Sequence, residues 1–472
     1  MSRLVLLAGF TLTCLSSADR AVAADRPNVL FIAVDDLNHW VGHLGRNPQT
    51  RTPNIDKLAA RGVTFRKAYC TAPACNPSRA SLLSGRRPSS TAVYTNSDNF
   101  LPLIPESQTL PTTFKNAGYE VLGAGKIYHG GLGRESEWTT IAKDLGRDPK
   151  VPAGVSDGVG GIKFAQLDCR DEDLEDYCIA DWSIDQLRKT HDKPFFLACG
   201  FHKPHMPWNV PRKYYDMFPL ETIQLPPTRE NDLADVPPPG VKIAGPQGDH
   251  ARMLESGRWK EAVQAYLATI AYLDMNVGRV IKALDESQHR DDTIIVLWGD
   301  HGWHLGEKEH WRKFALWEEA TRAPLMWVAP GVTQASGVCD RTVDFLSIYP
   351  TLCDLCQVPV PAHVEGPSLR PLLADPAAAW DRPALTTHGY QNHAVRSEKW
   401  RYIRYADGSE ELYDETADPF EWTNLASAAE HAATKAELAR WFPKVNAPPV
   451  GKKNEAQPKA RGKNKKKAAA NN

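Results

Sequence analysis

The sequence lacks a long apolar segment. The run at residues 4–15 is the longest near the start, and no later run is longer. Because a helix needs about 20 apolar residues to cross a bilayer, we expect no membrane-spanning segment. Internal repeats are also absent from the sequence.

An excess of charge of one sign is missing from most of the chain. Lys and Arg number 56 and Asp and Glu number 57, so the formal net charge is −1. The exception is the segment 452–467, which is rich in Lys and Arg. The body of the chain therefore does not indicate a nucleic-acid partner. We expect residues 451–472 to form a basic, disordered tail.

Residues 1–23 have the organisation of a secretory signal peptide. Arg3 provides the positive start, an apolar run follows, and Ala-Val-Ala at 21–23 provides a small-residue cleavage site. A buried N-terminal strand is the alternative, but Asp19 and Arg20 interrupt it. We expect the protein to be exported, to the periplasm or outside the cell.

Two pairs of cysteines lie close together in the sequence. In an exported protein Cys169 and Cys178 could close a short disulfide or stay free. Cys353 and Cys356 lie on an apolar helical pattern, which favours core packing over metal or redox chemistry.

Strand and helix patterns alternate through most of the chain. Runs apolar on both faces are typical of strands buried in a parallel sheet. The alternation predicts an α/β fold, a doubly wound and mostly parallel sheet flanked by helices. Strands are expected at 28–34, 63–69, 119–124, 194–199, 293–298 and 325–328, and helices at 52–62, 77–83, 110–117, 179–190, 261–286 and 343–356.

After residue 379 short strand patterns dominate, at 393–395, 400–405 and 411–413, and a helix follows near 428–441. They predict a smaller C-terminal α+β subdomain with a short antiparallel sheet. Residues 220–260, rich in Pro, are expected to form a long surface excursion. The predicted organisation is a signal peptide (1–23), a catalytic domain (25–378), a C-terminal subdomain (379–450) and the tail (451–472).

Polar pairs follow two of the apolar strands directly. Asp35 and Asp36 follow the strand at 28–34, and Asp300 and His301 follow the strand at 293–298. Ligands of open α/β sheets gather beyond the carboxyl ends of strands. Neighbouring carboxylates repel each other unless a cation lies between them, so these pairs are candidates for a metal site. An isolated pair would also fit a solvated turn.

Residues 75–88 read Cys-Asn-Pro-Ser-Arg-Ala-Ser-Leu-Leu-Ser-Gly-Arg-Arg-Pro. Pro77 suits the first position of a helix. Cys75 would then stand at a helix N-terminus, where free N–H groups and the helix dipole favour anions. Arg79 adds a fork of donors for an oxyanion. A buried cysteine before an ordinary helix is the alternative.

This segment resembles the sulfatase signature, Cys-x-Pro-Ser-Arg followed by Leu-Leu-Ser-Gly-Arg. The resemblance implies that a separate maturation enzyme oxidises Cys75 to formylglycine, an aldehyde that hydrates to a geminal diol. One hydroxyl group of the diol would attack sulfur, and the other would drive release of sulfate. Arg79 would belong to the same catalytic set.

The resemblance covers roughly residues 26–445 and implies a metal site. Asp35, Asp36, Asp300 and His301 would bind one Ca²⁺ together with the side chain at Cys75. Carboxylate oxygens suit such a hard cation, whereas imidazole is a less usual ligand for it. Many sulfatases have Asn at the position of His301.

The resemblance also assigns catalytic roles to Lys126, His129, His205 and Lys313. The lysines would stabilise negative charge in the transition state, and His129 would act as a base. His205 and Lys313 would hold sulfate oxygens, and one of them would protonate the leaving oxygen. His202 competes with His205, but the run His-Lys-Pro-His resembles the iduronate-2-sulfatases, in which the second His matches.

Residues 300–313 and 412–425 resemble the same subgroup. The expected substrate is therefore an O-sulfate ester of a uronate-containing or related sulfated polysaccharide or oligosaccharide. Three tryptophans could line a sugar site or pack in the core: Trp303, Trp311 and Trp317. Three residues of the C-terminal subdomain are candidates for substrate contacts: His388, Tyr390 and His393.

Other functions remain open at this point. Arylsulfatases, alkyl (choline-type) sulfatases and phosphonate monoester hydrolases share the nucleophile, and their leaving-group pockets lie in variable loops. A non-catalytic carbohydrate-binding relative would result if Cys75 were never oxidised. A metal-dependent phosphatase of the same superfold would carry Ser or Thr as its nucleophile. The sequence leaves the oligomeric state open.

Overall fold

The computed structural model describes residues 26–131 and 133–450. The expected signal peptide and basic tail lie outside these residues. Within the described part, no helix is both long enough and apolar enough to cross a membrane.

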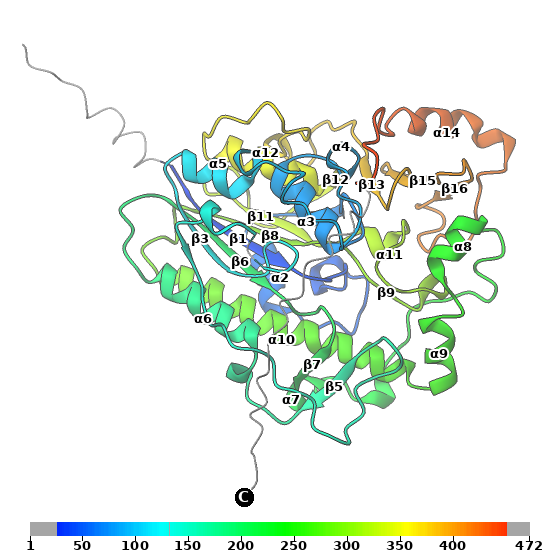
Figure 1. Cartoon of the computed structure of the whole chain (residues 1–472), viewed down its shortest axis with the longest axis horizontal. Helices are drawn as coiled ribbons and strands as arrows, with labels where there is room; N and C mark the ends of the chain where they lie inside the picture. The colour runs from blue at the N-terminus through cyan, green and yellow to red at the C-terminus, as the bar shows by residue number, and fades with distance from the viewer. Residues whose placement is uncertain (1–25, 132, 451–472) are drawn as a thin grey trace, which may run out of the picture.

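An eight-stranded sheet forms the centre of the molecule (Figure 1). Its strands run in the order β12-β2-β11-β8-β1-β6-β3-β4. Only β11 is antiparallel to its neighbours, so the predicted, mostly parallel sheet is confirmed. The strands are β1 (Asn28–Val34), β2 (Val63–Tyr69), β3 (Glu120–Gly125), β4 (Thr140–Ile141), β6 (Phe195–Phe201), β8 (Thr293–Gly299), β11 (Leu325–Val328) and β12 (Gly337–Asp344).

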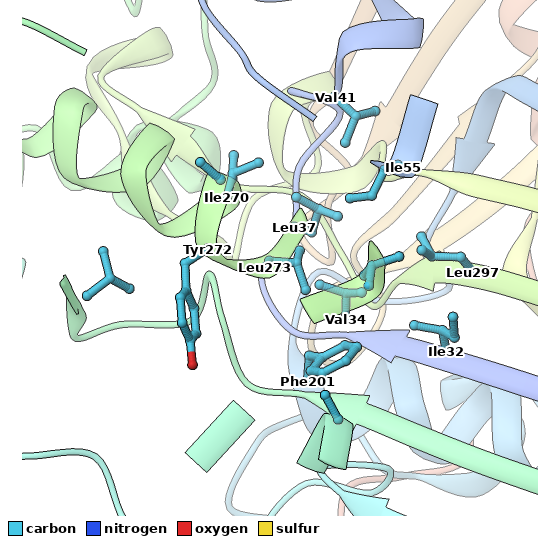
Figure 2. Close-up of a cluster of buried hydrophobic side chains, with 14 of the residues drawn as sticks. Ile32, Val34, Leu37, Val41, Ile55, Phe201, Ile270, Tyr272, Leu273 and Leu297 are labelled. Carbon is cyan, nitrogen blue, oxygen red and sulfur yellow. The ribbon is translucent and has the colours of Figure 1, made fainter. Parts of the chain in front are cut away.

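Helices cover both faces of this sheet, because alternate residues of each strand point to opposite sides. Ile32 and Val34 of β1 face α2 (Pro53–Ala59), α6 (Glu175–Leu187) and α10 (Trp259–Asp285). Figure 2 shows Val34 beside Leu273 of α10, and Ile32 beside Leu297 of β8. Phe31 faces the opposite layer of α3 (Cys75–Ser84), α5 (Leu110–Asn116) and α12 (Ile348–Leu355).

A second, antiparallel sheet forms the C-terminal part, as predicted. Its strands are β13 (Ala384–Thr387), β14 (His393–Arg396), β15 (Trp400–Arg404) and β16 (Glu410–Asp414), with α14 (Ala432–Ala439) packed against them. β13 also bonds to the chain that precedes α3, since Thr387 N donates to Thr71 O at 2.9 Å. The C-terminal sheet therefore supports the segment that leads to Cys75.

Shorter elements complete the fold. They are α4 (Pro88–Thr91), α7 (Arg212–Tyr215), α8 (Pro238–Ala244), α9 (Asp249–Ser256), α11 (Glu318–Thr321), α13 (Arg370–Ala374), β5 (Phe164–Leu167), β7 (Trp208–Pro211), β9 (His304–Leu305) and β10 (Trp311–Arg312).

One predicted helix needs correction. The helix expected over 343–356 is wrong in its first part, because Val343 pairs with Ala68 of β2 and thereby extends β12. Strand pairing prevails there over the helical pattern. The excursion at 220–260 contains α8 and α9, which end at Gly245 and Gly257 in left-handed conformations.

The structure also settles several side chains. Cys169 and Cys178 are free thiols, and Cys353 and Cys356 are buried as predicted. Trp303, Trp311 and Trp317 are buried in the core, so they do not line an open sugar site.

Candidate active site

Cys75 is the first residue of α3 and is completely buried. The predicted start at Pro77 is wrong by two residues, since Ser78 N donates to Ala74 O at 3.0 Å and closes the first turn there. Pro77 lies within that first turn, where an N–H group would have no acceptor inside the helix. The side chain at 75 thus lies at the positive end of the helix dipole.

The two polar pairs meet at the carboxyl end of the sheet, because β1 and β8 are parallel neighbours and end side by side. Asp300 N donates to Val34 O at 3.0 Å, and Asp36 N donates to Asp300 Oδ1 at 3.0 Å. Asp35, Asp36, Asp300 and His301 are all completely buried.

Three cations neutralise these carboxylates. Arg79 Nε donates to Asp300 Oδ2 at 2.8 Å, and its Nη1 donates to the carbonyl of Lys126. Lys126 Nζ pairs with Asp35, and Lys313 Nζ lies 2.6 Å from Asp36 Oδ1. Burial opposes ionisation of Asp35, but Lys126 and its neighbours hold its pKa well below the usual range. Each buried charge therefore has a partner, as stability requires.

The thiol of Cys75 points into this cluster. Its Sγ lies 3.2 Å from Lys313 Nζ, 3.3 Å from His301 Nε2 and 3.8 Å from Asp36 Oδ1. Burial and the Asp35 carboxylate oppose ionisation of the thiol, but Lys313 and the other cations hold its pKa well below the usual value. Position 75 is therefore suited to a negatively charged group.

The donors around Cys75 fit a bound cation. The ligand atoms of Asp35, Cys75, Asp300 and His301 all lie within 4.8 Å of one another. Asp35 Oδ1 and Asp36 Oδ2 are buried without a hydrogen-bond partner among the described residues. His301 Nδ1 contacts Gly302 O at 3.0 Å, which is suited to a donated proton and leaves Nε2 facing the cluster. A carboxylate-rich set of this kind suits a hard divalent ion.

His205, rather than His202, reaches the cluster. His205 Nε2 lies 3.8 Å from Asp36 Oδ2, and its side chain is 37% exposed. His202 instead faces Glu175, with Nε2 3.5 Å from Oε1. Asp176 accepts N–H bonds from His202 at 2.7 Å and from Lys203 at 2.8 Å, and so holds this segment.

His129 lies beside the cluster rather than inside it. It lines an open cavity of about 270 Å³ together with Asn76 and Asp98. His129 Nδ1 is buried and has no hydrogen-bond partner in the described part of the chain. Asn76 follows Cys75 directly, so the cavity adjoins the buried cluster.

Two supporting residues were not singled out from the sequence. Ser78 Oγ donates to Asp300 O at 2.6 Å, although Ser78 belongs to the motif itself. Tyr266 OH donates to Asp36 O at 2.8 Å and accepts from Asn38 N at 3.0 Å. Its position in the apolar stripe of α10 indicated only core packing.

Comparison with known proteins identifies the family. A model described as Sulfatase matches residues 27–358, and one described as N-sulphoglucosamine sulphohydrolase, C-terminal, matches residues 306–447. The chain belongs to the sulfatase family. The resemblance found in the sequence is thereby confirmed, and the protein is a sulfuric ester hydrolase.

Individual relatives cover most of this sulfatase. It is 40% identical to a Sulfatase of Formosa agariphila, over 94% of this chain and 92% of that protein. It is 31% identical to the Iduronate 2-sulfatase of Mus musculus, over 77% of this chain and 75% of that protein. A solved 2-O GAG sulfatase superposes with a TM-score of 0.70 at 25% identity, covering 88% of this chain and 90% of that one.

Proposed function

We propose that this sulfatase hydrolyses O-sulfate esters of a uronate-containing or related sulfated polysaccharide or oligosaccharide, using formylglycine made from Cys75. The observation that carries the proposal is the place of Cys75, between Lys313 and His301 at the N-terminus of α3. A separate maturation enzyme would oxidise the side chain. The similarity to an Iduronate 2-sulfatase supports the substrate class.

The cations around position 75 would receive the sulfate group. The hydrated aldehyde would supply one hydroxyl group to attack sulfur as the alcohol leaves, and loss of the proton from the other hydroxyl group would re-form the aldehyde as sulfate departs. Lys313 and Lys126 place positive charge where negative charge spreads over the sulfuryl oxygens. Arg79 bonds Asp300 and lies 3.7 Å from Asp35, and so keeps both carboxylates in position.

Two histidines would move protons. Burial opposes protonation of His205, but Asp36 and Asp35 raise its pKa above the ordinary value. A protonated His205 is suited to donate a proton to the leaving oxygen. His129 lines the adjoining cavity and would act as the base that promotes release of sulfate.

Asp35, Asp36, Asp300 and His301, with the side chain at Cys75, would hold one Ca²⁺. The ion would supply further positive charge for the sulfate group. The unpartnered buried oxygens of Asp35 and Asp36 support this assignment.

Secretion is part of the proposal, and its support is the signal-like order of residues 1–23. We also propose that the chain divides into a catalytic domain (25–378) and a C-terminal subdomain (379–450). The boundary lies shortly before β13, the first strand of the second sheet.

The proposed nucleophile is tested by mass spectrometry and substitution. The peptide that contains Cys75 should show loss of sulfur and gain of an aldehyde in active enzyme. Cys75→Ala should abolish hydrolysis of a 2-O-sulfated uronate oligosaccharide, whereas the control Cys178→Ala should retain it. An unmodified thiol in fully active enzyme would refute the mechanism. Hydrolysis of aryl sulfates alone would refute the substrate class.

A further inference from the structure

The C-terminal sheet carries a second polar cavity, apart from the one beside His129. It has a volume of about 220 Å³, and its lining includes Gln391, His393, Arg404 and Asn446. We call it the Arg404 pocket. His393 of β14 and Arg404 of β15 are direct partners across the two strands, so both side chains belong to one face of the sheet.

Arg404 makes no salt bridge among the described residues, and its guanidinium lies over the ring of Phe442 at 4.3 Å. Glu410 lies opposite Arg404 on β16, but its carboxylate is already bonded by Lys435 at 2.7 Å and by Tyr402. The neighbouring arginines of this sheet differ. Arg396 and Arg401 both pair with Glu415, at 3.3 Å and 3.0 Å. Arg404 is only half-buried, so its fork of donors stays accessible from the cavity.

His393 supplies a buried polar group to the same pocket. It is 3% exposed, and its Nδ1 lies 3.0 Å from Thr387 Oγ1. The His393 ring interacts with the side chain of Asn446, which also lines the pocket, so the two residues form one polar wall.

Ring contacts connect the Arg404 pocket with segments next to the catalytic centre through the turn between β13 and β14. His388 in this turn packs against Phe314, the neighbour of Lys313, with ring centroids 6.4 Å apart. Tyr390 packs against Tyr94 at 5.9 Å. The next residue after Tyr390 is Gln391, which lines the pocket.

From these contacts we infer that the Arg404 pocket binds a carboxylate or sulfate group on a sugar residue next to the one whose sulfate is hydrolysed. A planar guanidinium binds both kinds of oxyanion through paired donors. The inference rests on the proposed function and deepens it, because it makes the preferred substrate an oligosaccharide or polysaccharide rather than a single sugar.

The test compares a 2-O-sulfated uronate tetrasaccharide with the methyl glycoside of the sulfated monosaccharide. Arg404→Gln should raise the KM for the tetrasaccharide about tenfold more than the KM for the monosaccharide. Arg404→Lys keeps the charge but loses the fork, so its effect should be intermediate. Arg440→Gln, which removes an exposed arginine nearby, is the matched control and should leave the ratio unchanged. Thermal unfolding checks that each variant is folded.

A second measurement separates this inference from the proposed function. Calorimetric titration with an unsulfated uronate tetrasaccharide should show weaker binding to Arg404→Gln than to wild type. Equal binding by wild type and Arg404→Gln, or an unchanged ratio of the two KM values, would overturn the inference that the Arg404 pocket binds the neighbouring sugar. Wild type could hydrolyse neither sulfated sugar and still bind the unsulfated tetrasaccharide more tightly than Arg404→Gln does. The proposed function would then be wrong, and the inference about the Arg404 pocket would be supported.

Discussion

At the scale of the residue, the active site is a balance of buried charges. Asp35, Asp36 and Asp300 face Lys126, Lys313 and Arg79, and each carboxylate contacts at least one cation. Lys313 is distinctive because its Nζ contacts both Asp36 and the side chain at Cys75. It therefore connects the candidate metal ligands with the proposed nucleophile.

Replacement of Lys313 by Ala should lower kcat/KM by about a hundredfold or more. It removes the ammonium group that would stabilise negative charge on the sulfuryl oxygens. Steady-state kinetics with the sulfated oligosaccharide measures this loss. Lys282→Ala on the exposed face of α10 provides the control and should retain activity. Equal activity of the two variants would contradict the role of Lys313.

At the scale of the element, α6 and β6 position His205 together. Asp176 in the first turn of α6 accepts two N–H bonds from the residues that follow β6. Lys203 Nζ bonds Asp148 at 2.7 Å and Pro207 O at 3.0 Å, which fixes the other end of the segment. His205 thus extends from a backbone that is held at several points.

The carboxyl group of Asp176 should make stability depend on pH. Burial raises its folded-state pKa to about 7, against 3.8 for an Asp side chain in the unfolded chain. Between these pH values the unfolded chain releases the proton first, so stability is lost as pH rises from about 4 to about 7. Relative to Asp176→Asn, the free energy of unfolding of wild type should fall by at most about 4 kcal/mol between pH 4 and pH 7.

Urea unfolding of both proteins across the range measures this difference, and Asp185→Asn on the same helix serves as the control. A difference between wild type and Asp176→Asn that stays constant with pH would show that Asp176 does not titrate as stated.

At the scale of the whole molecule, buried ion pairs join the C-terminal sheet to α11. Arg401 of β15 is 1% exposed and donates to Glu318 of α11 and to Leu316 O. It also pairs with Glu415 and Glu421. Burial opposes ionisation of Glu318, but Arg396 and Arg401 hold its pKa well below the usual value.

Arg401→Met should destabilise the protein by about 3–5 kcal/mol, because it leaves buried carboxylates without their cation. Thermal or denaturant unfolding measures the change, and Arg440→Gln is the surface control. Since β13 also bonds to the segment before Cys75, activity should fall at a lower temperature than in wild type. A variant as stable as wild type would show that these ion pairs do not hold the C-terminal sheet to α11.

The sequence alone determined the local features of this protein. Strands apolar on both faces predicted a parallel sheet, and the polar residues at their ends predicted where ligands gather. Cys75 and Arg79 could be proposed because they lie within one short motif, and the other catalytic residues because the resemblance to sulfatases assigned them. Such patterns are readable because burial of a face and the conformation of a turn depend on residues close together in the chain.

The tertiary structure decided which distant residues meet. The sequence did not show that β11 runs antiparallel, that His202 turns to Glu175, or that Arg404 lies opposite Glu410 without a salt bridge in the described chain. Each depends on packing between segments far apart in sequence, and a local hydrophobic period carries no record of which strand or side chain becomes the neighbour.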